Sequence, residues 1–340
     1  MQRQTEGSAV FLWPKAESGR KQGGRDSPEA AWAVFTFTLQ NIRIIVLFYY
    51  TSEVLKVSKY YILYNPVAGN GTGLEKSRKL EEILKGNEIE FRDSKSIEDY
   101  AAFLAGLSAE DKIVISGGDG TLNSFINVTD GLSYTQSIYY YATGSGNDFL
   151  NDLGTDKEGV AEITDYLKNL PTVEVKGQKY KFINGVGYGI DGYCCEVGDK
   201  LRETTTKPIN YTGIAIKGLL FYFKPVNATI VVDGQTYEYK KVWLAPTMNG
   251  RFYGGGMMPT PHQDRLNPEH RVSVLVMFGS GKLKTLTVFP SIFKGEHLKH
   301  EEMCRELSGH DITVTFDRPC ALQVDGETIL DVTSYHVTTV

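Results

Sequence analysis

Short apolar runs alternate with amphipathic stretches between residues 59 and 171. The apolar runs are rich in β-branched and aromatic residues, which favours strands, and the stretches between them place apolar residues on one helical face. Strands that alternate with helices indicate a parallel sheet covered on both faces, the doubly wound α/β arrangement. The predicted strands are 60–64, 89–92, 112–116 and 137–142, and the predicted helices are 74–84, 97–107, one from Leu122 and one after Asp148.

Beyond residue 171 the pattern changes to short strand-like runs separated by turns. Asp233-Gly234 is a favourable two-residue hairpin turn, and helical patches interrupt the runs near 209–222 and 285–293. The pattern predicts a second domain that is antiparallel and β-rich, of the sandwich type. The last run, 335–339, could also return to the first domain.

Residues 1–57 match neither pattern. Residues 1–25 are polar and show no periodicity, which is typical of disorder. Residues 33–50 are apolar, but Arg43 lies among them, and a central Arg costs about 2.5–3.5 kcal/mol on insertion into a membrane. We therefore expect a strand or an unstructured extension there. The predicted division is a disordered or spurious extension (1–57), an α/β domain (58–170, possibly joined by 330–340) and a β-rich domain (171–329).

Composition narrows the function classes. The length of 340 residues fits two domains, and the net charge of -5 gives no basic excess, so we expect no nucleic-acid partner. The four cysteines form neither a C-x-x-C pair nor a disulfide framework, which is typical of free thiols in a reducing compartment. We expect a cytoplasmic protein.

The loop after the third predicted strand carries candidate chemistry, because residues 116–121 read S-G-G-D-G-T. Gly117, Gly118 and Gly120 let backbone N–H groups approach a phosphate, and Thr121 adds a hydroxyl at the start of a helix. Asp119 would repel a bare phosphate, so it indicates either bound Mg²⁺ or a role toward an attacking hydroxyl. The loop therefore predicts a phosphate site with Asp119 at the metal or at the attacking hydroxyl.

Two more loops follow the first and fourth predicted strands, and they read N-P-V-A-G at 65–69 and T-G-S-G-N-D at 143–148. Carboxyl ends of parallel strands meet at one edge of a sheet, so all three loops are expected to converge. Thr and Asn side chains can bond phosphate or ribose oxygens. The candidate nucleotide contacts in these two loops are Asn65, Pro66, Gly69, Thr143, Gly144, Asn147 and Asp148.

The three motifs, in this order and spacing, resemble the diacylglycerol kinase catalytic domain superfamily, which includes bacterial lipid kinases and the sphingosine and ceramide kinases. The resemblance runs from about residue 59 to the C-terminus. It implies an ATP-binding first domain, a β-rich second domain that supplies the lipid cleft, and an active site between them. It also implies that Asp119 acts in catalysis and metal handling.

A D-G-E turn at 325–327 matches the same family, in which one carboxylate is implied as the proton acceptor for the lipid hydroxyl. Phosphoryl transfer needs a carboxylate near the nucleophile, and the choice between Asp325 and Glu327 stays open. A family-like stretch ending at Asp191 makes that residue a candidate for the lipid head group, against a turn-capping role. The G-x-G-x-x-G at 187–192, which overlaps this stretch, is interpreted as close backbone packing.

One departure concerns a structural magnesium site. Family members often follow G-G-G-M with a basic-apolar-Asp-Asp-Gly segment, whereas this chain has G-G-G-M at 254–257 and R-L-N-P-E-H at 265–270. Either Asn267 or Glu269 substitutes as a ligand, or the site is absent.

These features predict an ATP- and Mg²⁺-dependent kinase that phosphorylates a lipid hydroxyl, with diacylglycerol as the first choice of acceptor and phosphatidic acid as product. The alternatives are a sphingoid-base or other lipid kinase, an NAD kinase that shares G-G-D-G-T, and a non-catalytic nucleotide-binding regulator. The expected partners are a lipid substrate at the membrane surface and the membrane itself, contacted peripherally. A homodimer is also considered.

Overall fold

The computed structural model describes residues 30–39, 42–51, 59–144, 146–155, 159–205 and 209–339. The chain divides into two compact units, Met1–Val57 and Ser58–Val340. In the first unit, β1 (Ala30–Leu39) and β2 (Ile42–Thr51) pair as antiparallel strands. Two strands form where one strand or an extension was expected, because β-branched and aromatic residues recur through both segments. The disorder predicted for residues 1–25 concerns residues outside the described part.

The second unit begins with a five-stranded sheet in the order β4-β3-β5-β6-β7. Its first four strands in this order are parallel, and β7 is antiparallel to β6. The strands are β3 (Lys59–Tyr64), β4 (Glu88–Asp93), β5 (Lys112–Gly117), β6 (Ser137–Ala142) and β7 (Ala161–Glu162). The helices are α1 (Ala68–Gly71), α2 (Gly73–Ser77), α3 (Leu80–Ile83), η1 (Ser94–Ser96), α4 (Tyr100–Ala105), α5 (Asp119–Val128), α6 (Asp148–Leu153) and η2 (Thr164–Leu167).

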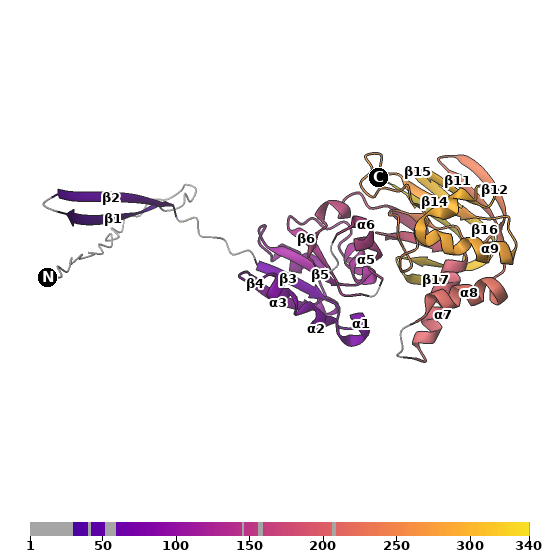
Figure 1. Cartoon of the computed structure of the whole chain (residues 1–340), viewed down its shortest axis with the longest axis horizontal. Helices are drawn as coiled ribbons and strands as arrows, with labels where there is room; N and C mark the ends of the chain where they lie inside the picture. Colours follow the sequence, from indigo (N-terminus) through magenta and orange to yellow (C-terminus); the bar gives the residue numbers. More distant parts are fainter. Residues whose placement is uncertain are drawn as a thin grey trace, which may run out of the picture. The chain divides into compact units, whose positions relative to one another are not determined.

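Helices cover both faces of this sheet. Ile113 and Ile115 of β5 pack in a cluster with residues of α4, α5 and α6, whereas Val114 packs on the opposite face with Leu80 of α3. In Figure 1, α2 and α3 lie on one side of the strands and α5 and α6 on the other. Successive side chains of a strand point to opposite faces of a sheet, and here both faces are buried under helices. The doubly wound α/β prediction is therefore confirmed.

The second sheet is antiparallel and has ten strands. Eight of them follow the order β15-β14-β13-β10-β16-β17-β8-β9, and the hairpin of β11 and β12 attaches to β16. The strands are β8 (Thr172–Val175), β9 (Gln178–Lys181), β10 (Gly185–Tyr188), β11 (Val226–Val232), β12 (Gln235–Val242), β13 (Thr247–Met248), β14 (Val272–Met277), β15 (Cys304–Gly309), β16 (Asp311–Val324) and β17 (Glu327–Thr338). The predicted β-rich second domain is confirmed.

The last strand belongs to this second sheet. β17 pairs with β16 and β8, so the suggested return of 330–340 to the first domain is corrected. The physical reason is local: a two-residue turn at Asp325-Gly326 brings β17 back along β16, with Val324 opposite Glu327. Both turn residues have positive φ, at 46° and 98°, as this tight hairpin requires.

Helices pack against the antiparallel sheet: α7 (Ile190–Arg202), α8 (Tyr211–Lys217), η3 (Gly218–Tyr222), α9 (Lys282–Val288), η4 (Phe289–Lys294) and η5 (Glu296–Lys299). α7 follows β10 directly. A Cβ on Gly192 of α7 would lie 1.8 Å from the Ala321 carbonyl oxygen, which supports close packing as the reason for the G-x-G-x-x-G glycines. Within the described residues, no helix combines the length and apolarity needed to cross a membrane.

Candidate active site

The three predicted loops meet at one edge of the parallel sheet. They leave the carboxyl ends of β3, β5 and β6, which are neighbours in the sheet. The Asn65 side-chain amide donates to the Thr121 hydroxyl at 3.1 Å, which joins the first loop to the second. The Thr143 backbone N–H donates to the Gly117 carbonyl oxygen at 2.8 Å, which joins the third loop to the second. The loops therefore form one continuous surface.

Glycine permits the close approach of these loops. A Cβ on Gly144 would lie 2.7 Å from the Cα of Gly118, so a side chain there would push the second and third loops apart. Gly120 is different, because a Cβ at that position would meet no atom within 4 Å. Open space beside Gly120, at the N-terminus of α5, leaves room for a ligand to reach the backbone.

Asp119 is the first residue of α5 and connects the second loop, to which it belongs, with the third. Its Oδ2 accepts a hydrogen bond of 2.7 Å from the backbone N–H of Asp148. Its Oδ1 is shielded from solvent and has no partner among the described residues. Burial, and next the neighbouring Asp148 carboxylate, raise the pKa of Asp119 to about 6. The site thus holds an incompletely satisfied carboxylate, which is costly unless a ligand completes it.

Two further buried oxygens in the third loop also lack partners among the described residues. These are the Thr143 hydroxyl and the side-chain oxygen of Asn147. Protein-bound Mg²⁺ is usually held by one or two carboxylates together with waters and substrate phosphates. The residues present fit this pattern, because Asp119 has a carboxylate oxygen without a partner among the described residues and lies among loops whose backbone N–H groups and hydroxyls suit phosphates.

The Asp148 carboxylate connects the two sheets. Its oxygens accept hydrogen bonds of 2.7 Å from the backbone N–H groups of Gly255 and Gly256, in the loop that precedes β14. Gly254, Gly255 and Gly256 all have positive φ, between 62° and 103°, a conformation that glycine adopts without strain. This three-glycine turn therefore presents two amides to one carboxylate, which fixes Asp148 from the side of the second sheet.

The two carboxylates of the D-G-E turn have different environments. The Asp325 oxygens accept four hydrogen bonds, one from the Asn123 amide at 2.8 Å and three from backbone N–H groups of residues 183–185 at 2.6–2.9 Å. Burial nevertheless raises the pKa of Asp325. The side chain of Glu327 is exposed and makes no hydrogen bond or ion pair with the described residues, although its backbone pairs with Val324 in the hairpin. Asp325 thus holds α5 against the second sheet, while Glu327 keeps its oxygens accessible.

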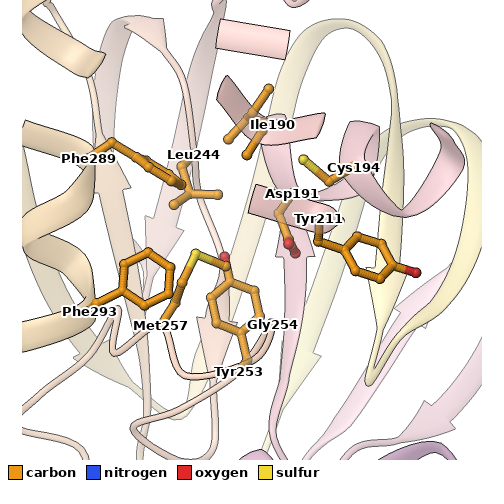
Figure 2. A pocket seen from close by; sticks show the side chains of 11 residues that line it. Ile190, Asp191, Cys194, Tyr211, Leu244, Tyr253, Gly254, Met257, Phe289 and Phe293 are labelled. Carbon is orange, nitrogen blue, oxygen red and sulfur yellow. The ribbon is translucent and has the colours of Figure 1, made fainter. Parts of the chain in front are cut away.

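Asp191 lies in the first turn of α7 at an apolar pocket. Its Oδ2 accepts from the Gln323 amide at 2.9 Å, and no side chain caps the N-terminus of α7. Burial raises the pKa of Asp191 to about 6. Figure 2 shows the pocket between Asp191 and Tyr211 on one side and Phe289, Phe293 and Met257 on the other. The remaining lining residues are Ile190, Cys194, Ala215, Leu244, Tyr253 and Gly254.

Asn267 and Glu269, the suggested substitutes in a structural magnesium site, have other partners. The Asn267 amide donates to the carbonyl oxygens of Asp264 and Arg271, and its oxygen accepts from the Arg271 N–H. Glu269 forms an ion pair with Arg271 at 2.6 Å. Asn267 therefore closes its loop with its own side chain.

Sequence reasoning missed two features of the site. Lys76 of α2 donates to the Thr143 carbonyl oxygen at 3.2 Å, so a cation stands beside the third loop. Asp152 of α6 is buried and accepts from Arg251 at 2.6 Å and from Arg265, which is also buried. No motif marked these residues, although Arg265 lies in the segment where the family's aspartates were expected. A single Lys or Asp in a helix does not indicate a functional contact until the fold shows which residues lie beside it.

Comparisons with known proteins agree with this arrangement. Residues 59–176 match the model of the diacylglycerol kinase catalytic domain, and residues 184–337 match the YegS C-terminal NAD kinase beta sandwich-like domain. The chain thus combines a diacylglycerol kinase catalytic domain with a YegS-like C-terminal domain. This pair of domains indicates a lipid kinase, which disfavours the NAD kinase and non-catalytic alternatives.

Individual relatives of this lipid kinase are distant but cover most of its length. A diacylglycerol kinase of Mycobacterium tuberculosis is 23% identical over 260 residues, 73% of this chain and 82% of that protein. A diacylglycerol kinase of Bacillus subtilis is 24% identical over 281 residues, covering 78% and 88%. The crystal structure of a diacylglycerol kinase from Bacillus anthracis aligns with a TM-score of 0.57 at 21% identity, covering 84% and 94%, and supports the fold.

Proposed function

We propose that this lipid kinase transfers the γ-phosphoryl group of ATP to the free hydroxyl of diacylglycerol, giving phosphatidic acid and ADP. One observation carries the proposal. The apolar pocket with Asp191 on its wall shares the three-glycine turn with Asp148, because Gly254 lines the pocket while Gly255 and Gly256 bind the Asp148 carboxylate. Asp148 in turn binds Asp119 through its N–H. A lipid hydroxyl near Asp191 would thus lie close to the nucleotide loops.

In the proposed reaction the loops hold the triphosphate and Asp119 holds Mg²⁺. The ion would neutralise charge on the β- and γ-phosphates, and positioning and electrostatics would supply most of the catalysis. Asn65, Thr121, Thr143 and Asn147 would orient the phosphates or ribose, and Lys76 would add positive charge beside the third loop. Pro66, Gly69, Gly117, Gly118, Gly120 and Gly144 would shape the cradle.

A carboxylate at the acceptor must orient the hydroxyl and take its proton. Asp325 already accepts four hydrogen bonds, so we assign it a positioning role and propose Glu327 as the proton acceptor in the D-G-E turn. Asp191 would orient the hydroxyl from the pocket wall. The same carboxylate also suits an ammonium group, so a sphingoid base is retained as the second candidate acceptor.

We expect Glu327→Gln and Asp325→Asn to fail in different ways. Glu327→Gln should lower kcat by about 10²–10⁴-fold and leave the melting temperature unchanged, because its side chain has no structural partner to lose. Asp325→Asn places an amide among backbone donors and should lower the free energy of unfolding by roughly 3 kcal/mol or more. Initial rates and thermal melts of both variants are the measurement. Wild-type kcat in Glu327→Gln would remove that residue from the mechanism.

The activity should fall as the pH drops through about 6. Asp119 and Asp191 both have a pKa raised to about 6 by burial, and both are needed as carboxylates. Below that pH the protonated acids prevail, so log(kcat/KM) should fall with a slope that approaches two protons per pH unit, since kcat/KM reports the free enzyme. Asp191→Asn should reduce the limiting slope to one. A profile that is flat down to pH 5 would contradict these assignments.

The direct test of the acceptor is transfer of labelled γ-phosphate. Wild-type protein with ATP and Mg²⁺ is incubated with diacylglycerol, a sphingoid base, a ceramide and NAD in separate reactions, and the labelled product is identified. We expect label in phosphatidic acid. Label in a sphingoid phosphate would select the second candidate, and label in NADP would overturn the lipid assignment.

A further inference from the structure

Two segments of the second unit, residues 216–224 and 282–294, expose large apolar side chains. Phe221 and Tyr222 of η3 are 70% and 67% exposed, and Leu283 of α9 is 78% exposed. Ile216 of α8 and Phe293 of η4 are exposed as well. Scattered single apolar residues on a surface are ordinary, but several from neighbouring elements need an explanation.

The two segments are neighbours in space. α9 packs against η3, and the Lys282 amine of α9 donates to the Leu220 carbonyl oxygen of η3 at 2.8 Å. Within η3, the rings of Phe221 and Tyr222 lie 6.3 Å apart. Figure 1 shows α8 and α9 at the same end of the antiparallel sheet. The exposed side chains therefore come from neighbouring elements, and we treat them as one face of the molecule.

The sequence around this face lacks acidic residues, unlike the rest of the chain. No Asp or Glu occurs from Thr204 to Val232 or from His270 to Gly295, although the whole protein has 41 acidic residues and a net charge of -5. From outside the two segments, Glu302 pairs with Lys284 at 2.7 Å. The exposed lysines of the segments are Lys217, Lys224, Lys282, Lys284 and Lys294.

The apolar pocket adjoins the same segments. Ala215 of α8 and Phe293 of η4 line the pocket, and Ile216, the next residue of α8, is exposed. Phe293 is both a lining residue and 40% exposed, so the pocket wall continues onto the surface. This continuity connects the outer face to the place where we propose that the acceptor lipid binds.

We infer that this face is a membrane-docking surface for a bilayer that carries anionic lipids. We define it as Ile216, Phe221, Tyr222, Leu283 and Phe293 with the lysines Lys217, Lys224, Lys282, Lys284 and Lys294. Apolar and aromatic side chains enter the interfacial region, and lysines around them pair with lipid phosphates. The inference rests on the proposed lipid-kinase function, because it supplies the route by which an acceptor passes from bilayer to pocket.

A second copy of the chain fits this face less well. In a symmetric dimer the same patch meets itself, which would set these lysines against their own copies with no acid in either segment to pair with them. An anionic bilayer offers negative charge over the whole contact area. The charge of the face therefore favours the membrane over self-association.

The test is flotation of the full-length protein with vesicles of phosphatidylcholine, with and without phosphatidylglycerol. We expect binding to anionic vesicles that weakens with added salt, because screening acts on exposed charges. Phe221→Ser with Leu283→Ser should weaken binding by about tenfold or more. Lys217→Gln and Lys294→Gln should each weaken it roughly fivefold at low salt. The matched control is Ile83→Ser, an exposed apolar position on α3 that should change nothing.

A soluble short-chain diacylglycerol separates docking from catalysis. The Phe221→Ser, Leu283→Ser variant should phosphorylate this dispersed substrate at the wild-type rate and lose activity only on vesicles, since neither residue lines the pocket. Wild-type vesicle binding in that variant overturns the docking surface, as does sedimentation showing that these substitutions dissociate a dimer. Salt-sensitive docking that the substitutions abolish, in a protein that phosphorylates no lipid, supports the surface and refutes the proposed function instead.

Discussion

Asp119→Asn is expected to abolish phosphoryl transfer and, at the same time, to make the ligand-free protein more stable. The loss of activity should reach about 10³-fold or more, because the variant removes the charge that would hold the metal at the phosphates. The gain in stability arises because burial disfavours the Asp119 carboxylate, raising its pKa from 3.8 to about 6. That difference corresponds to on the order of 3 kcal/mol at neutral pH. An asparagine oxygen can still accept from the Asp148 N–H.

The pH dependence makes this prediction specific. An acid whose pKa is raised by folding contributes its stability below its unfolded pKa and loses it as the pH rises through the folded pKa. The stability advantage of Asp119→Asn should therefore be small near pH 4, grow up to about pH 6 and stay constant above. Urea unfolding between pH 4 and 8 measures it, with Asp130→Asn, an exposed charge just beyond α5, as the control. An unchanged or lowered stability at pH 8 would show that the carboxylate is already satisfied without ligand.

Asp152→Ala should cost about 3–5 kcal/mol of unfolding free energy, the second largest effect that we expect. Asp152 is buried and receives hydrogen bonds from Arg251 and Arg265, and Arg265 is itself only 4% exposed. Removal of the carboxylate leaves the Arg265 guanidinium buried without its counter-charge. Since α6 carries both Asp148 and Asp152, the substitution should also loosen the contact between the two sheets.

Equilibrium unfolding in urea measures this effect against an exposed pair. Asp165 of η2 and Lys168, just after it, form an ion pair of 2.6 Å, with side chains 75% and 64% exposed. Asp165→Asn should change stability by less than about 1 kcal/mol, because an exposed ion pair is screened. A loss in Asp152→Ala no greater than in this control would mean that solvent reaches Arg265 and replaces the carboxylate.

The fold could be predicted because strands, helices and turns each leave a pattern in a few consecutive residues. β5 and β6 were predictable from continuous apolar runs, and the loops after them from glycine and threonine at strand ends. The convergence of those loops followed from the parallel sheet. The N-terminal hairpin was harder to predict. An apolar stretch interrupted by a few polar residues fits a pair of strands with a turn, and it fits an unstructured extension equally well.

The contacts between the two sheets could not be predicted. Asp148 and Gly255 are 107 residues apart, and Asn123 and Asp325 are 202 residues apart. Nothing in the local pattern around any of these residues indicates its partner. The choice between Asp325 and Glu327 was open for the same reason: both are acids in one turn, and only the packing of Asn123 and residues 183–185 gives Asp325 its donors.

The three-glycine turn joins the pocket to the nucleotide loops, so we expect the two proposed substrates to influence each other's binding. A lipid tail in the pocket would contact Gly254, and the amides of the next two residues donate to Asp148, whose N–H donates to the proposed metal ligand Asp119. Any factor by which the acceptor changes the nucleotide affinity must equal the factor by which the nucleotide changes the acceptor affinity, because thermodynamic linkage is reciprocal. The affinity for ATP, measured with and without acceptor, would therefore report the coupling through this one turn.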